Sequence, residues 1–463
     1  MKSSLQLYTA ALALCVAFTG CKKFLDVVPP SEITSANFYS SANDAEAGLV
    51  GCYDAMQPDS YYGFDMSGYG DVTSDDCDAG GDSQARQNMD DFTTNSTNGT
   101  ISRNWSQIYN AIGRTNDVIT NLGRMDDNLF QNGRKNVILG EARMLRGLHY
   151  FNLVRIFGGV PLVTEQVTDS RPETVNKPRS TPAEIYAQVI SDLQFAAANL
   201  PADATNGRAT KGAALGLLAK VYLTQKNWQQ AADYAGQVIT PGKYQLDANY
   251  DDLFAQDNTP EIIFSVQYVG QAEGNVLPDL LLPFPQASYE FIKFNVPTQS
   301  IMNAYETGDV RKASSIIVTN QSYGQNIPFV NKYRRAAAFA SPADITILRY
   351  ADVLLMRAEA LNELGGGNAE ALSLLNQVRT RAKLPVKTAA ELGTQAAFRD
   401  FVAKERRVEL AFEGERWFDL LRTGKAIATL QAAGKPITEK FLLFPLPQDE
   451  LDRNPNLVQN PGY

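Results

Sequence analysis

Apolar residues recur every three or four positions over most of the chain, which predicts a mainly helical protein. A first helix carries Ala45, Leu49, Cys52 and Met56 on one face. The other predicted helices span about 104–122, 134–157, 182–199, 208–224, 228–239, 344–364, 368–382 and 398–423. Apolar and polar residues alternate between 262 and 268, so this segment is predicted to be a strand.

Two long segments lack this helical pattern. Residues 57–103 are rich in Asp, Gly, Ser, Asn and Tyr, and residues 270–342 are rich in Pro, Gly, Asn and aromatic side chains. Unstructured loops of such length are uncommon in compact domains and are usually either functional or disordered. We therefore expect irregular loops from these two segments to form the functional surface.

Short turns join some of the helices into antiparallel pairs. Gly365, Gly366 and Gly367 separate the helices at 344–364 and 368–382, which favours a helical hairpin. Within 208–239, small and aromatic residues are spaced as in diverged tetratricopeptide repeats, where small side chains let two helices approach closely. Generic helix packing is the alternative interpretation of this second pair.

The N-terminus is typical of an export signal. Lys2 precedes an apolar run from Leu5 to Phe18, which is too short for a membrane span, and Thr19 and Gly20 follow it. Cys21 comes next, as in bacterial lipoproteins that are cleaved before a lipid-carrying cysteine. Residues 1–20 are thus predicted to be a signal peptide and 21–36 a lipidated, proline-containing leader that tethers the protein to a membrane. A plain secretory signal is the alternative.

Charge and cysteine content limit the candidate partners. The formal net charge of the 463-residue chain is −9 and it contains no long basic run, so nucleic acid is not an expected partner. Once Cys15 leaves with the signal and Cys21 carries lipid, Cys52 and Cys77 remain. In an oxidising compartment these two can form a disulfide, and two unpaired, partly buried thiols are the alternative.

Catalytic and metal motifs are absent from the sequence. The single histidine, His149, lies among apolar helix residues, and one histidine cannot supply a multi-histidine zinc site. Asp76 and Asp78 begin a calcium-like loop, but Gly80 stands where an oxygen ligand is required and Gln87 where a bidentate Glu is required. No cofactor is therefore expected, and an irregular calcium site in the Asp71–Asp82 loop is the alternative. The charged residues between 405 and 419 are spaced for salt-bridged helix packing.

Several long blocks resemble the SusD/RagB family of outer-membrane lipoproteins. The segment 141–162 (EARMLRGLHYFNLVRIFGGVPL) is similar to the signature of that family. CKKFLD at 21–26 resembles its lipidated start, and RYADVLLMRAEA at 349–360 resembles its C-terminal helix pair. ERRVEL at 405–410 and the ending NPNLVQNPGY at 454–463 agree as well. The resemblance covers the chain from residue 21 to its end.

This resemblance implies a fold, a location and a role. It implies a mainly α, SusD-like single domain over 37–463, with tetratricopeptide-like helix pairs as scaffold and irregular loops with a few short strands as ligand face. The protein would sit lipid-anchored on the outside of the outer membrane as the partner of a SusC-like TonB-dependent transporter. It would bind oligosaccharides without catalysis. A peptide-binding, RagB-like protein is the first alternative, and a surface glycoside hydrolase is the second.

Sugar recognition requires flat aromatic faces beside groups that hydrogen-bond to hydroxyls. Trp105, Trp228 and Trp417 all fall in helical patterns and are expected to pack the scaffold, which leaves Tyr and Phe for the ligand. The residues predicted to bind ligand come from the two irregular segments and are Tyr69, Asp75, Arg86 and Tyr289. Ordinary packing is the alternative for each aromatic side chain.

Overall fold

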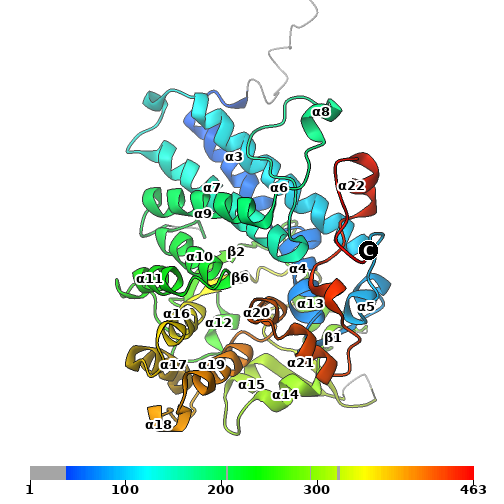
Figure 1. Cartoon of the computed structure of the whole chain (residues 1–463), viewed down its shortest axis with the longest axis vertical. Coiled ribbons are helices and arrows are strands. Elements are labelled where there is room, and N and C mark those ends of the chain that lie inside the picture. The colour runs from blue at the N-terminus through cyan, green and yellow to red at the C-terminus, as the bar shows by residue number, and fades with distance from the viewer. Residues whose placement is uncertain (1–37, 205–206, 292, 321–323) are drawn as a thin grey trace, which may run out of the picture.

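Long helices dominate the computed structural model, which describes residues 38–204, 207–291, 293–320 and 324–463 (Figure 1). The predicted signal peptide 1–20, Cys21 and the leader 21–36 lie outside these residues. The helices of more than ten residues are α3 (Ala42–Asp54), α6 (Gly99–Arg124), α7 (Arg134–Phe157), α9 (Pro182–Asn199), α10 (Lys211–Thr224), α11 (Trp228–Ile239), α16 (Tyr350–Leu364), α17 (Ala369–Arg381) and α19 (Gln395–Glu409).

Shorter elements connect them. The short α-helices are α4 (Asp65–Ser67), α5 (Gln84–Asp90), α8 (Pro172–Val175), α12 (Asp252–Ala255), α13 (Leu277–Leu281), α14 (Gln299–Ala304), α15 (Arg311–Ser315), α18 (Ala389–Leu392), α20 (Arg416–Thr423), α21 (Ala426–Ala432) and α22 (Gln448–Arg453). The strands are β1 (Cys77–Gly80), β2 (Ile262–Val266), β3 (Phe294–Pro297), β4 (Ile316–Thr319), β5 (Ile327–Val330) and β6 (Ile345–Arg349). They form three antiparallel pairs, β1–β3, β2–β6 and β4–β5.

Successive helices pack side by side into a stack. The packing runs from α6 through α7, α9, α10 and α11 to α16, and α16 also contacts α17 and α19. Helix α7 lies at the centre and is buried on nearly all sides. Local signals set the helix ends: α9 begins where Thr181 caps the amide of Glu184, and Pro182 occupies the first helical position. Among the described residues, no helix is both long and apolar enough to cross a membrane.

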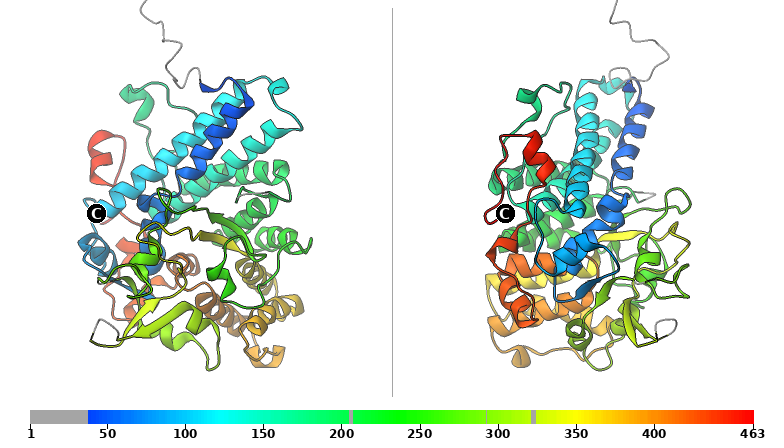
Figure 2. Two further views of the ribbon diagram at one scale, coloured as in Figure 1. Left: turned by 180° about the vertical axis from the view of Figure 1, so that it is seen from behind. Right: turned by 90° about the vertical axis from the view of Figure 1, so that its right-hand side faces the viewer.

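The strands and irregular loops between α12 and α16 lie on one side of the helix stack (Figure 2, right). This side contains α13 and the β4–β5 hairpin, and the β2–β6 pair connects it to the helices. Much of the irregular structure therefore lies together on one side of the helix scaffold.

Three predicted elements need correction. Residues 57–103 are not a surface loop, because they form α4, α5, β1 and two π-helical turns, and residues 61–77 are buried throughout. The predicted helix at 344–364 begins with strand β6, and α16 starts only at Tyr350. The predicted helix at 398–423 is interrupted after Glu409, where Gly414 adopts a φ of 76° before α20 begins.

His149 is a packed core residue, as predicted. Its side chain is fully buried, and its Nδ1 lies 2.8 Å from the Tyr61 hydroxyl. Burial lowers the pKa of His149 to about 3, so the ring is neutral at physiological pH.

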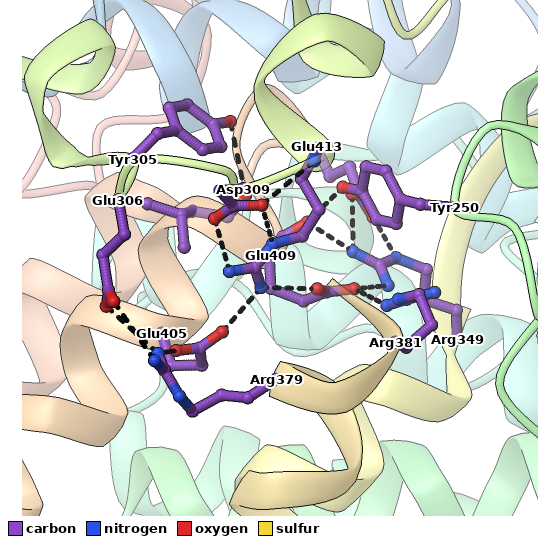
Figure 3. A network of polar contacts seen from close by, with 12 residues as sticks. Tyr250, Tyr305, Glu306, Asp309, Arg349, Arg379, Arg381, Glu405, Glu409 and Glu413 are labelled. Atoms are coloured by element: carbon purple, nitrogen blue, oxygen red, sulfur yellow. Dashed lines mark hydrogen bonds and ion pairs between the residues drawn. The ribbon is translucent and has the colours of Figure 1, made fainter. Parts of the chain in front are cut away.

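The charged residues between 405 and 419 form a buried ionic network rather than a catalytic cluster (Figure 3). Glu409 accepts hydrogen bonds from Arg349 at 2.5 Å and from Arg311 at 2.9 Å, and Arg381 is its third ion-pair partner. Glu405 pairs in the same way with Arg379 at 2.9 Å. These contacts join α19 to β6, α15 and α17, so the predicted salt-bridged packing is confirmed.

Candidate functional site

An exposed pair of parallel aromatic rings stands out on the irregular surface. Tyr289 is 49% exposed and Phe339 is 38% exposed. Their ring centroids lie 5.3 Å apart and the ring planes differ by 10°. Phe291 lies beside them, with its ring centroid 6.2 Å from that of Phe339. We call Tyr289, Phe291 and Phe339 the aromatic platform. Such flat, solvent-facing rings can stack against the apolar face of a sugar.

The platform is built from two loops that are about fifty residues apart in sequence. Tyr289 and Phe291 follow α13, whereas Phe339 lies between β5 and β6. Backbone pairing of Asn275 with Ser341 brings the two segments together. Gly274 permits the close approach, because a Cβ atom there would lie only 2.2 Å from the Cα of Ala340.

The backbone beneath Phe339 adopts an unusual conformation. Ala338 and Phe339 both have positive φ angles, of 50° and 63°. Residues other than glycine rarely adopt this region, and such conformations cluster at binding and catalytic sites, where the surrounding structure maintains them. Together with the exposed rings, this conformation makes the loop a candidate functional segment.

Three basic residues that precede Phe339 in the chain form ion pairs with carboxylates of the protein. Lys332 pairs with Glu413 at 2.6 Å, Arg335 pairs with Asp257 at 2.5 Å, and Arg334 pairs with Asp251. Glu290, next to Tyr289, is exposed. The platform thus combines apolar rings with the exposed Glu290 and with the buried ammonium of Lys293, which lies 3.5 Å from the ring centroid of Phe291.

Three of the four predicted ligand residues are buried and do not reach this surface. Tyr69 is fully buried, with its ring against that of Phe444. Arg86 is also fully buried over the ring of Phe64, and burial lowers the pKa of its guanidinium to about 10. Their predicted role in ligand contact is wrong for this structure, because both side chains fill the core beneath the surface.

Asp75 is buried as well and is bound by two arginines. Arg416 donates to it at 2.8 Å, and Arg407 lies at 2.8 Å. Burial alone would raise the pKa of Asp75, but the guanidinium groups of Arg416 and Arg407 bring it below its ordinary value. Asp75 therefore joins the segment 57–103 to α20 and is not free to bind a sugar. Of the predicted ligand residues, only Tyr289 lies on the exposed surface.

The predicted disulfide is also wrong. Cys52 and Cys77 are both free and buried. Cys52 lies in α3 and Cys77 begins β1, and these elements are in different parts of the fold (Figure 1). Burial raises the pKa of Cys52 to about 12, which makes its thiol a poor nucleophile.

The buried acidic residues of the segment 71–82 bind other parts of the protein. Asp76 pairs with Arg407 at 2.7 Å, and Asp71 accepts the amide of Gly414 at 3.0 Å. Across the part of the chain that the structure describes, no three His, Cys, Asp or Glu side chains are grouped to hold a metal ion.

Comparison with known proteins identifies the family. Residues 224–440 match the model of the SusD family, and residues 23–223 match a SusD-like model described as starch-binding and associating with the outer membrane. The SusD-like protein P2 of Formosa agariphila is 31% identical in an alignment that covers 98% of each chain. The chain belongs to the SusD family.

Solved structures of SusD-like proteins share the fold. A laminarin-binding SusD-like protein is 32% identical, with a TM-score of 0.80 over 92% of this chain and 100% of that one. A SusD superfamily protein from Bacteroides vulgatus is 26% identical, with a TM-score of 0.81 and the same coverage. The mainly α, SusD-like fold implied by the sequence resemblance is confirmed.

Within this SusD-family fold, sequence reasoning missed Phe339. It lies in the second irregular segment, but nothing local distinguishes it from other loop aromatics. The five residues before it, 334–338, show neither strand nor helix periodicity. This lack of a pattern predicts a loop but does not predict which side chain is exposed. Its contact with Tyr289 depends on the tertiary pairing of Asn275 with Ser341.

Proposed function

We propose that this SusD-family protein is a non-catalytic cell-surface lipoprotein that captures oligosaccharides on the aromatic platform. It would then deliver them to a SusC-like TonB-dependent transporter in the outer membrane. The observation that carries the proposal is the parallel, exposed pair of Tyr289 and Phe339. Exposed aromatic faces are costly to leave in water and match the apolar faces of pyranose rings.

The relatives support a glycan as ligand. The protein named for laminarin binding shares 32% identity and nearly the whole fold, and one matching family model is described as starch-binding. Both names denote polymers of neutral glucose units. The ion pairs of Lys332, Arg334 and Arg335 support the same class, because these cations are already neutralised by carboxylates. A sulfated or uronic glycan would gain little from them.

Titration calorimetry with a ligand panel tests the proposal. The panel contains laminarin oligosaccharides, maltooligosaccharides, an acidic polysaccharide and a peptide mixture. We expect saturable heat with at least one neutral oligosaccharide and none with the acidic polysaccharide. Reducing-end analysis after prolonged incubation should show no hydrolysis. Binding of peptides alone would favour the RagB-like alternative, and release of reducing ends would favour a glycoside hydrolase.

The lipid anchor is proposed from Cys21 and the family match. The match to the family model described as associating with the outer membrane begins at residue 23, two residues after this cysteine. Cys21→Ala should leave glycan affinity unchanged and abolish retention on the cell surface, because lasting attachment depends on the acyl chains. Fractionation of cells and glycan uptake assays measure both effects. Normal retention and uptake by this variant would contradict the tether, and failure of the wild-type protein to co-purify with a SusC-like transporter would contradict delivery.

A further inference from the structure

One buried carboxylate connects the two loops of the aromatic platform. Asp279 lies in the short helix α13 and is fully buried. Its Oδ1 accepts the amide of Ser288 at 2.7 Å. Its Oδ2 accepts the amides of Ala337 at 3.2 Å and Phe339 at 2.9 Å. The same side chain therefore binds the backbone beside Tyr289 and the backbone that carries Phe339.

Ser288 and Lys293 add further hydrogen bonds within and between the two loops. The Ser288 hydroxyl accepts the amide of Ala338 at 2.7 Å, so the two loops also bind each other directly. Lys293 donates to the carbonyls of Asp279 and Tyr289, each at 2.8 Å, and its ammonium lies 3.5 Å from the ring centroid of Phe291. Lys293 thereby supplies positive charge next to the buried carboxylate and holds the backbone of Tyr289.

These bonds account for the unusual conformation of the Phe339 loop. Ala338 and Phe339 have positive φ angles, and the loop is not part of a helix or strand that would otherwise bind its amides. Hydrogen bonds from amides to an ionised carboxylate are stronger than those between neutral groups. Asp279 thus supplies acceptors for the amides on both sides of Ala338 and keeps the two rings parallel before any ligand arrives.

We propose that Asp279 is the positioning residue of the glycan site. It does not contact ligand, but it fixes Tyr289 and Phe339 relative to each other, so that the platform binds as a preorganised unit. This inference rests on the proposed function. Preorganisation reduces the entropy lost on binding, and a platform whose loops move independently should therefore bind more weakly.

The test is the variant Asp279→Asn, which keeps the shape of the side chain. It replaces one acceptor oxygen with an NH₂ group, a donor that cannot bind the backbone N–H groups facing it. We expect affinity for laminarin oligosaccharides to fall about tenfold or more, the range for a lost charged hydrogen bond. Hydrogen exchange should become faster at the amides of Ser288, Ala337 and Phe339. The variant should keep the circular dichroism spectrum of the wild-type protein but melt at a lower temperature, because buried amides lose an acceptor. Unchanged affinity and exchange in this variant would overturn the proposal.

Asp71→Asn is the matched control. Asp71 is also a buried carboxylate that accepts a backbone amide, but its partner is Gly414, away from the platform. Burial raises the pKa of Asp71 to about 8, so the side chain is largely neutral at pH 7 and asparagine is a close substitute. Its glycan affinity should equal that of the wild-type protein. An equal loss of affinity in both variants would show a general effect of buried carboxylates and contradict positioning by Asp279.

Two readouts separate this inference from the proposed function. If the wild-type protein binds no glycan, the proposed function fails, while the exchange rates still test the connection between the loops. If the wild-type protein binds glycan but Asp279→Asn does not fold, the same measurements are made on Ser288→Ala. This variant removes only the hydrogen bond between the Ser288 hydroxyl and the amide of Ala338. That variant should lose about two- to tenfold in affinity. No change in its affinity or exchange would overturn the proposal.

Discussion

Replacing Glu409 with alanine is expected to lower the free energy of unfolding by about 3–5 kcal/mol. The substitution removes one carboxylate and leaves Arg311, Arg349 and Arg381 without their shared partner in the core (Figure 3). Breaking a buried ion pair by removing one member costs about 3–5 kcal/mol, because the remaining charge is neither paired nor solvated. A typical domain has a free energy of unfolding of only about 5–15 kcal/mol. Here three buried guanidinium groups each lose one carboxylate. Arg311 keeps Asp309 and Glu405, Arg349 keeps Glu261 and Glu413, and Arg381 keeps Glu261.

Urea unfolding followed by circular dichroism measures the effect. Asp400→Ala is the matched control, because Asp400 forms an ion pair with Lys425 whose side chains are 68% and 47% exposed. Exposed pairs contribute about 0–1 kcal/mol, so the control should unfold almost as the wild-type protein does. A Glu409→Ala protein that unfolds at the same urea concentration as the control would contradict the structural role of the network.

Loss of either exposed ring of the platform is expected to abolish detectable glycan binding without changing the fold. Tyr289→Ala and Phe339→Ala remove side chains that are 49% and 38% exposed, so little buried apolar area is lost. Each change leaves a single ring where the platform had two parallel ones. Calorimetry with the oligosaccharide that the wild-type protein binds best should give no measurable heat for either variant at the concentrations that saturate the wild-type protein.

A second parallel aromatic pair provides the control. Tyr222 and Tyr234 lie on α10 and α11, with ring centroids 5.5 Å apart and planes within 4°. Tyr222→Ala should therefore match the platform variants in chemistry but keep full glycan affinity. Loss of binding in Tyr222→Ala together with normal binding in Tyr289→Ala would place the ligand on the helix scaffold instead.

The helices of the scaffold follow from local sequence. The bounds predicted for α7, α9 and α11 agree with the structure. Thr181 and Asn227 cap α9 and α11, and Gly133 and Gly158 flank α7. The sequence predicts helix where the structure has strand β6, because Ile345 and Ile347 fit a helical as well as a strand pattern of apolar residues. The interruption after Glu409 was also missed. It is set by the turn at Gly414 and by the tertiary contacts of Glu413 with Lys332 and Arg349.

The binding surface was only partly predictable. The polar composition of 57–103 predicts an exposed loop, because aspartate and arginine side chains such as Asp75, Asp76 and Arg86 are rarely buried without a partner of opposite charge. The arginines that permit the burial of both aspartates, Arg407 and Arg416, lie more than three hundred residues later in the chain. No local pattern reveals such partners. The irregularity of 270–342 did locate the exposed aromatic surface, and Tyr289 on it, whereas pairing with Phe339 required the fold.

Hydrogen exchange with and without bound glycan tests the central claim most directly, namely that the platform is the ligand site. Mass spectrometry of the wild-type protein with saturating laminarin oligosaccharide, or with the best ligand of the panel, would locate the protected segments. The account predicts slower exchange at residues 288–291 and 337–340 and little change in α10 and α11. Protection confined to the helices, with none in the two platform loops, would contradict it.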